Sequence, residues 1–208
     1  MDLYFAPLAC SMATRIALYE AGANANYIAR DRNKRLPDGS DFLAINPLGM
    51  VPTLRTDDGT VLTENAAILQ YVADRFPAAQ LAPTGGMERA RLHQWLSFIG
   101  TELHKAVFLP LLQRTAPAEA KSYAQGLADA RLAIVEKHLT GRECLLDRFS
   151  IADAYLFTVF NWSTATTVKL DRFPAIQAYL ARLRERPSVA KALGEEFALY
   201  KAEAAKAA

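Results

Sequence analysis

The chain has 208 residues, of which 51% are hydrophobic and 22% are charged. This length suits one large domain or two modest ones, and the mixed composition excludes a disordered or fibrous protein. A formal charge of +2 argues against the broad basic surface of a nucleic-acid-binding protein, and no segment is predicted to cross a membrane. Because the start of the chain also lacks the basic residues of a signal peptide, we expect a cytoplasmic protein.

The first 80 residues are predicted to mix strands and helices. Alternating apolar residues indicate strands, and apolar residues three or four positions apart indicate helices. Gly22 is a suitable helix stop, and the residue before Pro47 avoids helical dihedrals. The expected elements are a strand at 2–5, a helix at 12–23, a strand at 26–30 and a short helical turn at 40–46.

The segment 51–64 is predicted to form a β-hairpin. Asp58-Gly59 separates its two alternating runs, which is the pattern of a tight turn of the primed type. Residues 65–76 then have the apolar spacing of an amphipathic helix. The uncharged segment Pro77–Gly86 combines prolines with a glycine pair and indicates a linker between two domains.

From Met87 onward the pattern is helical, which predicts a helical bundle. Pro110 should end or kink the first of these helices. Ser150 and Asp153 have the spacing of a capping box at the start of a later helix, and its loss should cost about 1 kcal/mol or more. We therefore expect two domains, 1–80 and 87–208.

Cys10 and Cys144 are the two cysteines, too few and too far apart for a disulfide framework, so each is expected to be a free thiol. Cys10 lies just before or at the first turn of a predicted helix, where the positive end of the helix dipole would stabilise a thiolate. Three interpretations of Cys10 stay open: a small buried side chain, a redox nucleophile and a contact for another thiol. Cys144 is interpreted as structural.

A strand, a cysteine turn, a helix, a second strand and a strand that begins at Val51-Pro52 are typical of a thioredoxin-like domain. With the linker and the helical remainder, nearly the whole chain resembles the cytosolic glutathione S-transferases of the bacterial beta class. This resemblance implies an α/β thioredoxin-like domain followed by an all-α bundle. The segments that carry it are PLACSMA, NPLGMVPTL, DDGTVLTENAAILQYVAD, TELHK and FSIADAYLFTV.

The resemblance implies a glutathione site on the first domain. Cys10 would contact the sulfur of glutathione, and can hold it as a mixed disulfide. Pro52 would follow a cis peptide bond, and the backbone of Val51 would pair with the cysteinyl part of the tripeptide. Glu64 and Asn65, at the start of a helix, would hold the γ-glutamyl end, since helix amides bind carboxylates and a carboxylate binds an ammonium.

Further residues follow from the same resemblance. Lys34, in the basic run 30–35, would approach the glycyl carboxylate, with Arg35 as the alternative. His104 would meet the thiol from the helical domain and act with Cys10 in catalysis. Ser97 and Thr101 match positions that reach glutathione in the partner subunit, and no metal is expected. The electrophile pocket is expected to be lined by Phe108, Leu109, Leu112, Trp162 and Thr166.

The leading functional hypothesis is a homodimeric enzyme that conjugates glutathione to small, mostly apolar electrophiles. The second is a glutathione-dependent disulfide reductase or peroxidase in which Cys10 cycles through a mixed disulfide. The third is a binding or scaffold protein without catalysis. The presence of Cys10, Lys34, Glu64 and His104 together argues against the third hypothesis.

Overall fold

The computed structural model describes residues 1–206, which divide into two compact units. Unit 1 is formed by Met1–Leu81 together with the C-terminal segment that begins at Pro187, and unit 2 by Ala82–Arg186. The boundary between Leu81 and Ala82 lies inside the segment expected to be a linker. The last helix, which was expected in the helical domain, instead packs with the residues of unit 1.

The core of unit 1 is a mixed β-sheet. Within the described residues it has four strands in the order β2-β1-β3-β4. The first strand pairs in parallel with β2 and antiparallel with β3, and β3 pairs antiparallel with β4. The strands are β1 (Asp2–Phe5), β2 (Asn26–Ala29), β3 (Thr53–Arg55) and β4 (Val61–Thr63). This is the expected thioredoxin-like sheet.

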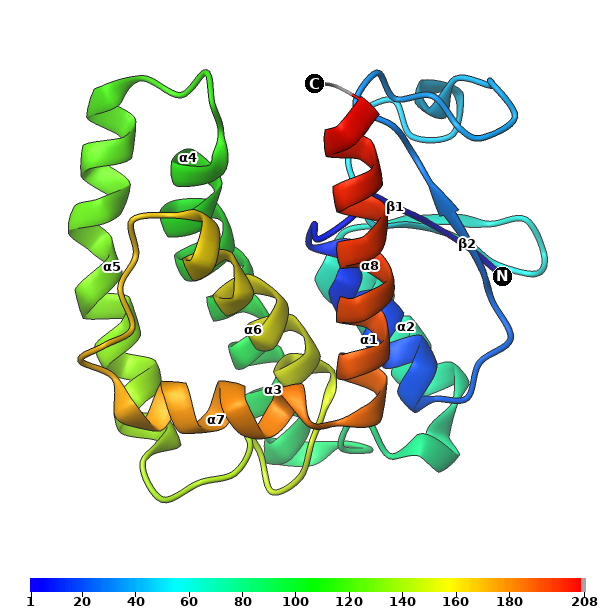
Figure 1. The fold of residues 1–208 in the computed structure, drawn as a ribbon. Coiled ribbons are helices and arrows are strands. Elements are labelled where there is room, and N and C mark those ends of the chain that lie inside the picture. Colours follow the sequence, from blue (N-terminus) through cyan, green and yellow to red (C-terminus); the bar gives the residue numbers. More distant parts are fainter. Residues whose placement is uncertain (207–208) are drawn as a thin grey trace. The chain divides into compact units, whose positions relative to one another are not determined.

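Helices α1, α2 and α8 belong to the same unit, and α1 packs against both α2 and α8 (Figure 1). Ile16 and Leu18 of α1 are completely buried, so α1 presents an apolar side to the core of unit 1. Gly22 follows α1 with φ of 60°, which a glycine adopts without strain. The helical elements of unit 1 are α1 (Ser11–Glu20), η1 (Phe42–Ala44), α2 (Asn65–Arg75), η2 (Pro77–Ala79) and α8 (Pro187–Lys206).

The β3–β4 hairpin is confirmed, but its turn is not of the predicted primed type. Gly59 N–H donates to the Thr56 carbonyl at 3.0 Å, and Thr56 N–H donates to the Thr60 carbonyl at 2.9 Å. Of residues 56–60, which the structure describes, Gly59 alone has a positive φ, whereas a primed turn needs one at its first central residue. Asp58 instead accepts the Thr56 hydroxyl and Thr60 N–H, which stabilises a type I turn that ends in a left-handed glycine.

Unit 2 is helical, as expected, and α6 is buried along nearly its whole length. Helix α5 packs against η3, α4 and α7 (Figure 1). Over the part of the chain that the structure describes, none of the helices combines the length and the apolar character needed to cross a bilayer. The helical elements of unit 2 are α3 (Gly86–Phe98), η3 (Ile99–Phe108), α4 (Leu109–Leu112), α5 (Ala118–Leu139), α6 (Ile151–Asn161), η4 (Trp162–Ala165) and α7 (Pro174–Arg184).

The segment between α3 and α4 is π-helical. Leu109 N–H donates to the His104 carbonyl, five residues back, and the helix ends at Leu112, soon after Pro110. Proline has no N–H and its ring crowds the carbonyl four residues earlier, which favours a wider turn. The break predicted at Pro110 therefore takes the form of a change in helical register followed by the end of the helix.

The capping box at the start of α6 is confirmed. Ser150 N–H and the Ser150 hydroxyl donate to Asp153 Oδ2 at 2.9 and 2.8 Å. The other oxygen of Asp153 accepts Leu145 N–H and the Tyr179 hydroxyl, each at 2.9 Å. Asp153 therefore joins the loop before α6 and helix α7 to the helix start, which is more than the sequence pattern indicated.

Candidate functional site

Cys10 occupies the N-cap of α1 and is half-buried. Its thiol donates to the Val51 carbonyl at 2.9 Å, and its own carbonyl accepts the side-chain amide of Asn65 at 2.9 Å. The peptide bond between Val51 and Pro52 is cis, which confirms the expectation drawn from the resemblance. Three of the predicted site residues, Cys10, Val51 and Asn65, are therefore in direct contact within unit 1.

The two cysteines lie in different electrostatic surroundings. The first turn of α1 contains no acidic residue, so the positive end of its dipole acts on Cys10 without an opposing charge on that turn. Burial, followed by the nearby Asp153 carboxylate, raises the pKa of the Cys144 thiol to about 11. Cys144 is therefore protonated at neutral pH, which agrees with its interpretation as a structural residue.

The start of α2 contributes Glu64 and Asn65. Asn65 is 5% exposed, and its side chain accepts the Thr14 hydroxyl at 3.0 Å in addition to its contact with Cys10. Its amide thus connects α2 to α1. In the first turn of α2 the Ala67 N–H donates to the Glu64 carbonyl at 3.1 Å, and the two amides before it are those that a helix leaves without an acceptor of its own. Glu64 is exposed and has φ of 67°, an unfavourable backbone for a residue with a side chain. This helix start can accept a carboxylate at its amides and an ammonium at Glu64.

Lys34 also lies in unit 1, in the turn after β2. It is half-buried with φ of 61°, and its side chain runs across Gly49. A Cβ on Gly49 would come within 2.6 Å of the Lys34 amine, so the close approach depends on glycine. Arg35, the alternative in the sequence analysis, is exposed and pairs through its backbone with Asp41 and Asp31. Between Lys34 and Arg35, burial favours Lys34 as the residue with the more defined position.

His104 lies in unit 2, on η3, and is 8% exposed. Its Nδ1 is 2.7 Å from the Tyr155 hydroxyl, and its ring meets the Trp162 ring edge to face at 4.9 Å. Burial, and to a smaller degree Lys105, lowers the pKa of His104 to about 4. His104 is therefore a neutral imidazole at physiological pH, able to form hydrogen bonds but carrying no charge.

Ser97 and Thr101 are both exposed on unit 2, at the junction of α3 and η3. They lie one helical turn apart, and the Thr101 hydroxyl donates to the Ser97 carbonyl at 3.0 Å. Both positions are thus open to a ligand or to a second subunit.

The residues expected to line the electrophile pocket fall into two groups. Phe108 and Trp162 are buried and their rings lie 6.0 Å apart, beside His104. Leu109 and Leu112 of α4 and Thr166 after η4 are half-buried. The first pair forms an aromatic wall, and the others lie nearer to the surface of unit 2.

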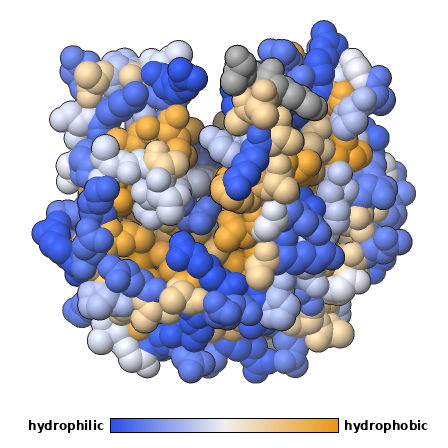
Figure 2. Space-filling view, in the orientation of Figure 1, coloured by the Kyte–Doolittle hydropathy of each residue, from blue (hydrophilic) through white to orange (hydrophobic). Residues whose placement is uncertain are grey.

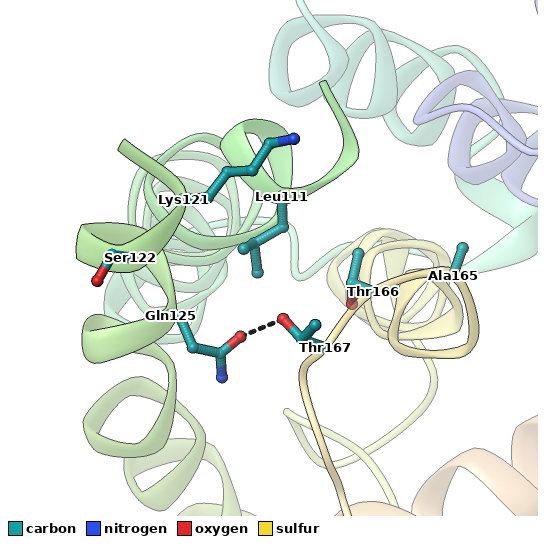
Figure 3. A pocket seen from close by; sticks show the side chains of 7 residues that line it. All are labelled: Leu111, Lys121, Ser122, Gln125, Ala165, Thr166 and Thr167. Atoms are coloured by element: carbon teal, nitrogen blue, oxygen red, sulfur yellow. Dashed lines mark hydrogen bonds between the residues drawn. The ribbon is translucent and has the colours of Figure 1, made fainter. Parts of the chain in front are cut away.

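A cavity of about 440 Å³ lies in unit 2, between α4, the first turns of α5 and the segment after η4. Figure 3 shows the side chains that line it. Thr166 is the predicted pocket residue that lines it, and Leu111 points into its middle. Gln125 and Thr167 hydrogen bond across one side. Its walls are more polar than the sequence analysis expected. The lining residues are Leu111, Lys121, Ser122, Gln125, Ala165, Thr166 and Thr167.

Sequence reasoning missed Tyr155, the partner of His104, and Thr14, the partner of Asn65. Tyr155 stands in a mostly apolar segment, IADAYLFTV, which gives no sign that the Tyr155 hydroxyl contacts a histidine. Within the described residues, no group of three or more His, Cys, Asp or Glu side chains could hold a metal ion.

Comparison with known proteins identifies the family. The family model for the N-terminal domain of glutathione S-transferases matches residues 9–75, and that for the C-terminal domain matches residues 100–187. Glutathione S-transferase GstA of Escherichia coli O157:H7 is 42% identical over 199 residues, which cover 94% of this chain and 98% of that protein. The chain therefore belongs to the glutathione S-transferase family.

Solved structures similar to this chain are also glutathione S-transferases. A ternary complex of BphK, a bacterial glutathione S-transferase, is 43% identical with a TM-score of 0.91 and covers 94% of this chain and 99% of its own. A sphingomonad glutathione S-transferase complexed with glutathione is 42% identical with a TM-score of 0.89, covering 94% and 98%. The beta-class enzyme of Sphingomonas chungbukensis, 42% identical over the same shares, has a TM-score of 0.90. These neighbours confirm the expected fold, the transferase activity class and the likeness to the bacterial beta class.

Proposed function

We propose that this transferase conjugates glutathione to small, mostly apolar electrophiles, with glutathione bound on unit 1. The observation that supports the proposal best is the contact of the Cys10 thiol with the Val51 carbonyl at the start of α1. Cys10 would meet the glutathione sulfur, and the Val51 backbone its cysteinyl part. Glu64 and the amides at Asn65 would bind the γ-glutamyl end, and Lys34 the glycyl carboxylate.

In the proposed reaction the glutathione thiol releases its proton to solvent, and the thiolate attacks the electrophilic carbon. With an aryl halide, a carbon–sulfur bond forms and halide leaves. We propose that His104 serves as a neutral hydrogen-bonding group for the sulfur, because its pKa of about 4 removes the imidazolium at neutral pH. Donors that favour the thiolate lower the barrier to attack.

The proposal is tested by turnover of glutathione with an aryl halide and with an epoxide. We expect conjugation with Michaelis kinetics in both substrates, and retention of the protein on a glutathione resin. Cys10→Ala and Lys34→Ala should each raise KM for glutathione, by about tenfold if one charged or thiol contact is lost. No turnover across a broad panel of electrophiles would refute the proposal, and failure to bind the resin would support a scaffold role.

The electrophile is proposed to bind on unit 2. The aromatic rings of Phe108 and Trp162 support an apolar substrate, while Lys121 and Thr166 in the cavity support a polar substituent on it. A pair of aryl halides that differ by one carboxylate separates the two contributions. We expect the carboxylate to lower KM in the wild type and to lose this advantage in Lys121→Ala.

A homodimer and a cytoplasmic location complete the proposal. The exposed Ser97 and Thr101 support the dimer, because a second subunit could use them to reach bound glutathione. Light scattering should give twice the mass of one chain, and a monomeric mass at micromolar concentration would contradict the dimer. The presence of two free thiols supports a reducing compartment, which cell fractionation can check.

A second candidate function, disulfide exchange, is favoured by the position of Cys10 at a helix N-terminus. The Cys10 thiolate would attack glutathione disulfide, forming a mixed disulfide and releasing one glutathione thiolate, and a second glutathione would then restore Cys10. Cys10→Ala distinguishes the candidates. If exchange disappears and conjugation survives, Cys10 is a redox residue, and mass spectrometry should find a reductant-sensitive adduct on Cys10 rather than on Cys144.

A further inference from the structure

Helix α8 buries a carboxylate and exposes apolar side chains, which reverses the usual arrangement. Glu196 is completely buried, whereas Phe197 and Leu199 are 46% and 39% exposed. Figure 2 shows hydrophobic residues, in orange and pale orange, on the surface over α8. Burying a charged group is costly unless its neighbours compensate, so the position of Glu196 calls for a specific partner inside unit 1.

That partner is the backbone just before Cys10. Glu196 Oε2 accepts the Leu8 N–H at 2.8 Å, across 188 positions of sequence. The other oxygen, Oε1, lies 3.7 Å from Arg15 Nη1, and among the described residues neither of these two atoms has a hydrogen-bond partner. Arg15 makes its closer ion pair with Glu195, at 2.5 Å. Glu195 thus provides the close negative charge for Arg15, and Glu196 forms its hydrogen bond with the backbone N–H of Leu8.

The turn that Glu196 holds is one that the chain disfavours by itself. Leu8 has φ of 59°, in the left-handed region that residues with a side chain rarely adopt. Ala9 N–H then donates to the Ala6 carbonyl at 3.1 Å, and Cys10 follows at the N-cap of α1. The Glu196 carboxylate, from a helix far along the sequence, stabilises Leu8 in this conformation. This turn fixes the position of Cys10 at the N-cap of α1.

We propose that Glu196 is a positioning residue for Cys10: by accepting the Leu8 N–H it fixes the turn of residues 6–10 and aims the thiol at the Val51 carbonyl, where glutathione sulfur is to bind. The part that concerns glutathione rests on the proposed function. The proposed effect of Glu196 on the position of the Cys10 thiol does not depend on that function.

The charged groups that face Glu196 are Arg15 from α1 and Glu195 from its own helix. Burial raises the pKa of Glu196 to about 7, and the Leu8 N–H and Arg15 oppose this rise. The carboxylate, which is the stronger acceptor, therefore forms as the pH rises through 7. The conformation of the Cys10 turn should respond to pH in the same range.

The first experiment measures alkylation of Cys10 by iodoacetamide from pH 5.5 to 9 without glutathione, in a Cys144→Ala background so that Cys10 is the one thiol. Glu196→Gln keeps the size of the side chain and removes its charge. We expect the variant to lose an inflection near pH 7 and to differ from wild type by about threefold at pH 7.5. Glu195→Gln alters the same Arg15 but not the contact with Leu8, and is the control. It should keep the inflection, moved to lower pH because one negative charge that faces Glu196 is gone.

The second experiment is a double-mutant cycle in the conjugation reaction. Glu196→Leu should reduce kcat/KM for glutathione by about tenfold in the Cys10 enzyme and by less than about twofold in Cys10→Ala, because it acts through Cys10. Equal losses in both backgrounds, superimposable alkylation profiles of wild type and Glu196→Gln, or an equal change in Glu195→Gln would overturn the proposal. If conjugation is absent altogether, the alkylation profile still decides the matter.

Discussion

Unfavourable backbone conformations mark single residues around the candidate glutathione site. Leu8, Lys34 and Glu64 have φ of 59°, 61° and 67°, and each is a proposed site residue or lies two positions from Cys10. Such conformations persist only where neighbouring groups enforce them, and they concentrate at functional sites. In this protein the enforcing group at Leu8 is Glu196, and Gly49 leaves the space that the Lys34 side chain occupies.

The contact of Lys34 with Gly49 predicts the effect of a single methyl group. Gly49→Ala would place a Cβ within 2.7 Å of the end of the Lys34 side chain, so the amine must move. If Lys34 binds the glycyl carboxylate, KM for glutathione should rise about fivefold to tenfold while kcat changes little. Steady-state kinetics with varied glutathione measures this effect.

Gly39→Ala is the matched control. Gly39 also has a positive φ, of 82°, but a Cβ there would meet no atom within 4 Å. Both substitutions carry the backbone penalty, of about 1 kcal/mol, and only one displaces Lys34. A similar rise in KM in both variants would show that backbone strain, and not the position of Lys34, controls glutathione binding.

At the scale of elements, the helix starts were more predictable than the hydrogen bonds that connect them. The pattern Ser150-x-x-Asp153 specified the capping box because both partners are local. The remaining contacts of Asp153, with Leu145 and Tyr179, were not predicted, since they join segments that meet only after the helices pack. The type of the turn at Asp58-Gly59 was predicted wrongly although its contacts are local. The glycine was placed correctly, but the hydrogen bonds of the Asp58 side chain selected another turn type.

The capping box predicts a graded loss of stability. Ser150→Ala should lower the free energy of unfolding by about 1 kcal/mol, the value of a lost N-cap. Asp153→Asn should cost about 3 kcal/mol, because its amide places a donor against buried donors that the carboxylate accepts. Urea unfolding followed by circular dichroism measures both, with the exposed Asp147→Asn as a control near zero. The idea is refuted if Asp153→Asn is as stable as the control.

At the scale of the whole molecule, two buried titratable groups give opposite pH dependences. The pKa of His104 is lowered by burial, so its contribution to stability is present above pH 6.5 and is lost as the pH falls toward 4. The pKa of Glu196 is raised by burial, so its contribution is present below pH 4.5 and is lost as the pH rises through about 7. Between pH 5 and 7 the two effects partly cancel, and wild-type stability should vary little.

Removing His104 should reveal the pH dependence that Glu196 gives to the free energy of unfolding. In the wild type, the low pKa of His104 lowers the free energy of unfolding by about 2 kcal/mol between pH 7 and pH 5. His104→Gln has no imidazole to protonate, so this decrease should be absent from the variant. Relative to wild type, the variant should therefore gain stability as the pH falls. Urea unfolding at the two pH values measures the difference. Parallel pH dependences of the two proteins would contradict a neutral, buried His104.

The sequence by itself determined the thioredoxin-like sheet, the helical remainder, the capping box and, through its resemblance to a family, the residues expected to bind glutathione. These features depend on local periodicity or on short motifs, which are legible along the chain. Only the tertiary structure decided that α8 belongs with unit 1, that Tyr155 binds His104 and that Glu196 holds the turn before Cys10. Those contacts join residues far apart in sequence, and burial then sets their pKa values, so no local pattern can specify them.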